Sequence, residues 1–262
     1  MKTLSMRAAA LMCLGIVAAS GDAVGGQEGS ETIRLRGQVL VEAGKGLPGA
    51  TIRTDALRGI GGGQFAAQRV FNVRTDRNGE WSLLGVTGGL WVLEISAPDH
   101  LPHVVVIPIY MMRKPEPRPW DSSVSLLPAT LVAGSGSDGS GARVVEAAER
   151  LLAGDRTAAR DALLRLSESQ LGPPALCALG DLALLLREPA IARKYFDLAA
   201  SIDAKWYRPQ LGIASASMMM LDFDRAIKGY AAARSGAVNQ RVERMLSGAV
   251  AELQQIRTIG KY

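Results

Sequence analysis

The sequence predicts a multidomain β plus α protein, in which an N-terminal antiparallel β-sandwich precedes a C-terminal α-helical repeat domain that forms an α-α superhelix. Three observations predict this fold class. Short apolar stretches with a period of two, broken by turn residues, run from Ile33 to about Leu127. After Ala142 the apolar period changes to that of a helix. Within the helical half, a set of residue types recurs 34 residues later.

The first 23 residues are predicted to be a secretory signal peptide. Lys2 and Arg7 precede an apolar run over residues 8–19, and small residues follow this run. Because a spanning helix needs about 20 apolar residues, we expect cleavage between Ser20 and Gly26 and no integral membrane span afterwards. The mature protein is then exported to the periplasm or the extracellular space. An uncleaved anchor is the alternative.

The β-sandwich is predicted over residues 32–130, after a flexible, Gly-rich lead at 24–31. Its first strand, Ile33–Val41, alternates apolar with polar residues, as a half-buried strand does. Turn residues such as those of Gly44–Ala50 follow at short intervals, which favours antiparallel strands in a sandwich. The expected strands are 33–41, 50–54, 69–75, 80–84, 90–96, 103–110 and 122–128.

A Gly/Ser linker is predicted at 131–141, because this segment has few side chains to bury. The helical repeat domain is predicted over 142–262, with about seven helices. Asp155 is a plausible N-cap, and Pro189 stands in a first turn, where its missing N–H does no harm. The expected helices cover 142–154, 155–169, 173–188, 189–203, 208–221, 222–236 and 238–257.

The repeat in the helical half consists of large, small and aromatic positions at a fixed offset. The matched positions are Leu179 with Ile213, Gly180 with Ala214, Ala192 with Ala226, Phe196 with Tyr230, and Ala199 with Ala233. Residues 142–236 therefore resemble the tetratricopeptide repeat family, which implies stacked pairs of antiparallel helices. Ala204 departs from that family, which usually has Pro at the turn between repeats. A plain helical bundle is the alternative.

The β half resembles the carboxypeptidase regulatory-like domain, a transthyretin-like sandwich. The positions that carry the resemblance are Gly37, Val39, Gly46, Pro48, Gly49, Ala50, Thr75, Asp76, Gly79, Trp81, Leu83, Gly89, Trp91, Leu93, Ile95 and Ala97. His100 stands where the family usually has a ring residue, and Arg58–Gln68 is extra length. The resemblance implies a non-catalytic module with tryptophans 81 and 91 inside.

Three motifs could be interpreted as metal or phosphate sites, but each is explained more simply by an ordinary structural role. The residues Asp76, Asn78 and Glu80 supply only part of a calcium loop and are typical of a hairpin turn. The glycines of 59–63 are followed by a strand, so a phosphate loop is not expected. The histidines, 100 and 103, would point to opposite faces of a strand and do not share a metal. We therefore expect no cofactor, no metal and no enzymatic activity.

Composition argues against nucleic-acid binding and against an internal disulfide. The net charge is +5, but the 30 Lys and Arg are spread among 25 Asp and Glu without a basic run, so nucleic acid is not an expected partner. Signal cleavage would leave Cys177 as a single cysteine, most simply a small buried side chain. The mature monomer then has no internal disulfide.

These expectations favour a non-catalytic exported scaffold or binding protein. Its helical repeats would bind a protein or peptide partner of the cell envelope on their concave face, with the β-sandwich as an accessory interaction module. The predicted contact residues are Asp181, Leu184, Arg208 and Ser215, chosen because they lie opposite the packing positions. The alternative is binding of carbohydrate or envelope polymer by exposed tryptophans. Burial of Trp81 and Trp91 would leave Trp120 as the candidate for that role.

Overall fold

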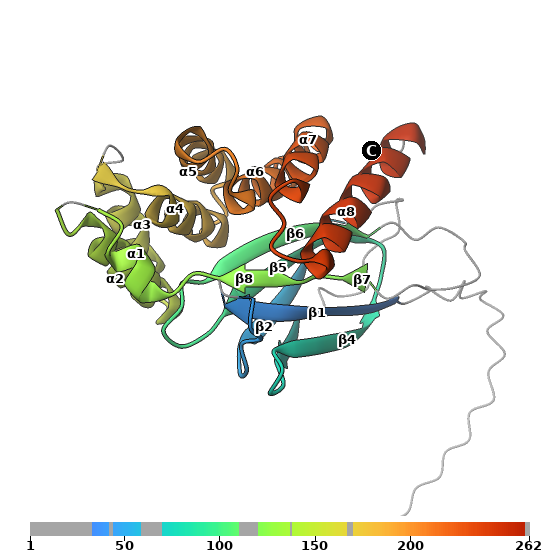
Figure 1. Ribbon diagram of the computed structural model, residues 1–262, viewed down its shortest axis with the longest axis horizontal. Coiled ribbons are helices and arrows are strands. Elements are labelled where there is room, and N and C mark those ends of the chain that lie inside the picture. Colours follow the sequence, from blue (N-terminus) through green and yellow to red (C-terminus); the bar gives the residue numbers. More distant parts are fainter. Residues whose placement is uncertain are drawn as a thin grey trace, which may run out of the picture. The chain divides into compact units, whose positions relative to one another are not determined.

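The computed structural model describes residues 33–41, 44–58, 70–109, 120–136, 138–166 and 170–259. The predicted signal peptide and lead, residues 1–31, lie outside the described residues, as does most of the extra segment 58–68. In the part that is described, a β region is followed by an α-helical region, in the order that the sequence predicts (Figure 1). None of the described helices is long and apolar enough to cross a membrane.

The strands of the described region form two sheets. Their bounds are β1 (Ile33–Val41), β2 (Thr51–Arg58), β3 (Phe71–Arg74), β4 (Glu80–Val86), β5 (Gly89–Ser96), β6 (His103–Ile109), β7 (Trp120–Asp121) and β8 (Val124–Leu126). One sheet has the order β4-β1-β7, with β8 also pairing with β1. The other has the order β3-β2-β5-β6, with antiparallel neighbours throughout. Strand β6 is therefore an edge strand of its sheet.

The turn between β3 and β4 has the form that its sequence predicts. The Asp76 carboxylate accepts the backbone N–H of Asn78 at 2.8 Å and that of Glu80 at 2.9 Å. Gly79 has a φ of 74°, which glycine adopts without steric cost. Asp76 therefore closes a hairpin. Trp81 and Trp91 are both buried, as expected.

The helices follow the last strand directly. Their bounds are α1 (Ala129–Ala133), α2 (Ser140–Leu152), α3 (Arg156–Arg165), α4 (Pro173–Leu185), α5 (Pro189–Ile202), α6 (Tyr207–Met219), α7 (Phe223–Arg234) and α8 (Gln240–Ile259). The Asp155 side chain accepts the N–H of Ala158 at 2.9 Å, which confirms it as the N-cap of α3. Pro189 is the first residue of α5, which confirms its predicted place in a first turn.

The helical part fits a repeat, in which α4 and α5 correspond to α6 and α7. All the positions matched at the 34-residue offset are buried. A Cβ atom at Gly180 would lie 2.6 Å from the Phe196 ring, and one at Gly212 would lie 2.3 Å from it. The ring of Phe196 is thus held between glycines of α4 and α6. The small positions of the repeat let neighbouring helices approach this closely.

The segment predicted as a flexible linker, 131–141, takes part in packing instead. It contains the end of α1 and the start of α2, and both Ser140 and Gly141 are buried. A Cβ atom at Gly141 would lie 2.2 Å from the carbonyl oxygen of Val132. This glycine therefore serves close approach of two helices. Composition alone does not distinguish that role from flexibility. The described residues between 33 and 259 accordingly fall within one compact unit.

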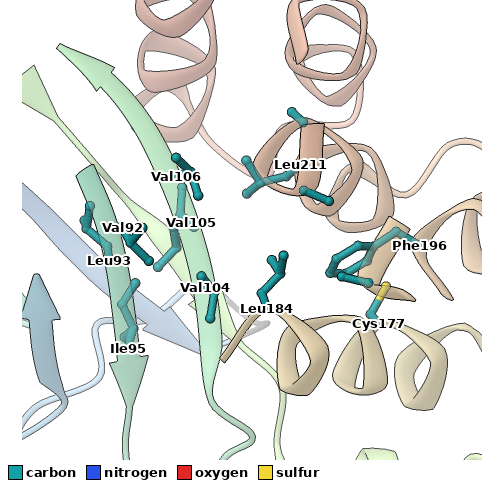
Figure 2. Packing of buried hydrophobic residues seen from close by; sticks show 14 of the residues in the cluster. Val92, Leu93, Ile95, Val104, Val105, Val106, Cys177, Leu184, Phe196 and Leu211 are labelled. Carbon is teal, nitrogen blue, oxygen red and sulfur yellow. The ribbon is translucent and has the colours of Figure 1, made fainter. Parts of the chain in front are cut away.

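The helical part covers the free edge of β6. Helices α4, α6 and α8 pack against this strand (Figure 1). Every residue of β6 is buried. Leu184 of α4 and Leu211 of α6 lie between the strand and the helices, facing Val104 to Val106 (Figure 2). The apolar core is thus continuous from the sheets into the helices.

Candidate functional site

The four residues predicted to contact a partner lie together, but they face strand β6 rather than solvent. Asp181, Leu184 and Ser215 are 0% exposed, and Arg208 is 1% exposed. The sequence grouped these residues on one helical face. The structure places an extended segment of the same chain on that face, so the residues are not a free surface.

The face holds β6 through its backbone. The N–H of Val104 donates to the Asp181 carboxylate at 3.1 Å, and the N–H of Val106 donates to the Ser215 hydroxyl at 3.2 Å. The Tyr230 hydroxyl of α7 donates to the carbonyl oxygen of Val106. Two residues further on, Pro108 has no N–H to satisfy, and proline in a sheet is confined to edge strands for this reason. We call Asp181, Arg208, Ser215 and Tyr230 the strand-holding face.

A buried ionic cluster lies at one end of this face. The Asp181 carboxylate also accepts from His103 Nδ1 at 2.9 Å and from the Arg208 guanidinium at 3.1 Å. Arg208 donates as well to the carbonyl oxygen of Ser125 in β8, at 2.6 Å. Because a carboxylate only accepts, the imidazole proton sits on Nδ1 and Nε2 carries none. The cluster joins β6, β8, α4 and α6.

Three other buried groups near this face, namely His103, Cys177 and Tyr230, are held in their neutral forms. Burial is the main cause that lowers the pKa of His103, and the nearby Arg208 charge lowers it further, while Asp181 acts in the opposite direction. Burial raises the pKa of the Cys177 thiol and of the Tyr230 phenol. Neither group is therefore an activated nucleophile at neutral pH. The arrangement suits packing and positioning, with no access for a substrate.

A partner could reach the strand-holding face only by displacing β6. Five aliphatic side chains of this strand are buried, namely Val104, Val105, Val106, Ile107 and Ile109. At about 1.5–3 kcal/mol for each, their exposure costs on the order of 10 kcal/mol. That is comparable with the whole free energy of unfolding of an ordinary domain. Under neutral conditions the face is consequently closed.

A groove between α2 and α3 is open to solvent. Its volume is about 350 Å³. Charged side chains form its walls, namely Arg143, Glu146, Arg150, Asp161 and Arg165. Alanines 147, 158 and 162 also line it, so a segment can approach the helix backbones closely. The same two helices carry Leu152 and Leu164, which are 54% and 64% exposed. Sequence reasoning did not predict this groove, because its lining comes from two helices with ordinary polar faces.

Trp91, Trp120 and His100, which the sequence analysis also considered, lie in the strands or next to them. Trp91 Nε1 donates to the Thr87 carbonyl oxygen at 2.8 Å, so both its ring and its N–H are used inside the protein. Trp120 lies in β7, opposite Leu35 of β1. Its side chain falls outside the described residues. His100 contacts the carbonyl oxygen of Pro98 at 2.7 Å. Among the residues described, no group of three or more metal-ligating side chains gathers.

Comparison with known proteins identifies no family. No family model matches the chain, and no curated protein matches it. Catechol 1,2-dioxygenase from Acinetobacter sp. ADP1 is 15% identical over 40% of this chain and 55% of that chain, with a TM-score of 0.30. This chain therefore spans about half the length of that dioxygenase. PcrH in complex with the chaperone binding region of PopD is 19% identical over 49% of this chain and 98% of that chain, with a TM-score of 0.38. Similarity this weak assigns no activity.

Proposed function

We propose that this chain is a non-catalytic exported scaffold or binding protein. In this proposal the β part is a carboxypeptidase regulatory-like sandwich, and the helical part is a tetratricopeptide-like superhelix whose concave face is filled by β6. The partner is a protein or peptide of the cell envelope, and it binds in the groove between α2 and α3. The observation that carries the proposal is the contrast between these two helical surfaces: one is closed by the chain itself, and the other is open.

The lining of the groove suits a peptide segment better than a small apolar ligand. Its walls carry three arginines and two acids, so it offers ionic contacts of both signs. Arg150 is paired with Glu146 at 2.6 Å, but both side chains are more than half exposed, so this pair contributes little and can re-form with a partner. The alanines allow close approach, and Leu166 adds an apolar contact to the lining. Charge and shape together favour a charged, amphipathic segment.

The proposal is tested with the full-length chain by quantitative crosslinking in the native envelope. Arg143→Glu combined with Arg165→Glu reverses two charges in the groove. The control, Arg34→Glu combined with Arg36→Glu, reverses two charges on exposed positions of strand β1. We expect the groove variant to recover at least tenfold less of the crosslinked partner than the native chain does. The control variant should recover as much as the native chain. Equal recovery by both variants, or the same loss in both, would contradict the proposal.

The alternative function, binding of carbohydrate or envelope polymer by the β part, depends on Trp120. Trp81 and Trp91 are buried and offer no ring to a sugar. A glycan array compares the full-length chain with Trp120→Ala. Binding that the substitution abolishes would favour this alternative over protein scaffolding.

A further inference from the structure

We infer that acid weakens the contact between the strand-holding face and β6, with His103 as the group that takes up the proton. Closed molecules still predominate, but the fraction in which β6 has left the helical face rises as the pH falls. In that fraction the face presents the Asp181 and Ser215 side chains that otherwise hold a strand by its N–H groups. The inference does not rest on the α2–α3 groove.

His103 is fully buried, and only one of its two ring nitrogens has a hydrogen-bond partner among the described residues. His103 is 0% exposed, and its Nδ1–H is committed to Asp181 at 2.9 Å. Its Nε2 has no hydrogen-bond partner among the described residues. A second proton on the ring would sit on that nitrogen as a buried N–H without an acceptor. A buried polar group left in this state costs free energy, and a charged one costs more.

The charges around neutral His103 are already balanced. The Asp181 carboxylate already faces Arg208 at 3.1 Å, so these two charges offset each other. Among the described residues, the charged groups that act on His103 are Asp181 from α4 and Arg208 from α6, while its partner on β5 is the apolar Ile95. Protonation would therefore leave one uncompensated positive charge in a site without solvent.

The sign of the pH effect follows from these contacts. Burial and Arg208 lower the pKa of His103 in the closed state, whereas a solvated imidazole has a pKa of about 6.5. The closed contact thus has its full stability above about pH 6.5. Below that pH the open state binds the proton better, and the opening equilibrium rises by up to about tenfold per pH unit. Carboxylic acid side chains in model peptides have pKa values of about 4, so a pH window separates this effect from general acid unfolding.

Residue-resolved hydrogen exchange of the full-length chain tests the inference. The amides of Val104 and Val106 donate to helix side chains, so their protection reports the contact itself. Protection is compared at pH 7.5 and pH 5.2, with the intrinsic exchange rate corrected at each pH. We expect the protection factors of these two amides to fall about tenfold or more, while amides of the β2–β5 pairing keep theirs. Unchanged protection at Val104 and Val106 would overturn the inference, as would equal loss across the whole sheet.

His103→Asn is the matched variant, since its amide nitrogen can replace Nδ1 as the donor to Asp181 and does not titrate in this range. We expect it to remove most of the pH dependence. The native chain gives a second measurement that does not require this variant to fold. It contains two histidines, and His100→Asn assigns their imidazole NMR signals. Titration of His103 that leaves Val104 protected would contradict the inference, and so would pH dependence that persists in His103→Asn.

Discussion

The Asp181 carboxylate on α4 accepts the backbone N–H of Val104 on β6 at 3.1 Å, across 77 positions of the chain. One side chain thereby satisfies an edge-strand donor, His103 and Arg208 together. An exposed sheet edge invites pairing with other chains, and covering it with helices removes that hazard. This contact ties the helical part to the sheet and explains why an acidic residue stands inside an apolar helix.

Asp181→Asn should destabilise the protein by about 3–5 kcal/mol, because it leaves the Arg208 charge buried without its counter-ion. The substitution keeps the shape of the side chain, so a cavity does not account for the loss. Urea unfolding at pH 7.5 measures it.

Asp224→Asn is the control for this change, since Asp224 pairs with Arg257 at 3.0 Å but both side chains are well exposed. It should cost less than about 1 kcal/mol. Similar losses in the two variants would show that the buried cluster contributes nothing special to stability.

The residues around Asp181 show which features could be predicted from the sequence and which could not. Local signals predicted the Asp76 turn and the Asp155 N-cap, because both depend on neighbours within four positions. The repeat pattern also placed Asp181 and Ser215 on one helical face. It did not reveal what covers that face, since a groove that binds another protein and one that holds its own strand call for the same polar residues. Pro108 was the available signal, as it marks β6 as an edge strand.

Gly180→Ala should destabilise the helical part even though alanine is the better helix former by about 1 kcal/mol. Its Cβ would lie 2.6 Å from the Phe196 ring. The ring has no room to retreat, because Gly212 of α6 also approaches it closely. Overpacking of this kind costs about 1–3 kcal/mol, so we expect a net loss in thermal or urea unfolding.

Phe196→Leu in the same chain provides the matching test. It makes space at the crossing, so Gly180→Ala should cost less in the Phe196→Leu background than in the native one. Identical costs in both backgrounds would mean that the ring does not limit the approach of the helices.

Cys177 should resist thiol reagents in the folded protein. Its side chain is buried, and burial raises the pKa of the thiol, so the reactive thiolate is scarce and out of reach. Reaction with an aromatic disulfide reagent at pH 8 should therefore be slow and should follow unfolding of the helical part. Urea should accelerate it to the rate of a free thiol. Asp181→Asn weakens the contact that holds α4 against β6, so it should speed labelling without denaturant. Fast labelling of Cys177 in the native chain, located by peptide mapping because the sequence also contains Cys13, would show that α4 opens on its own, independently of the contact between Asp181 and Val104.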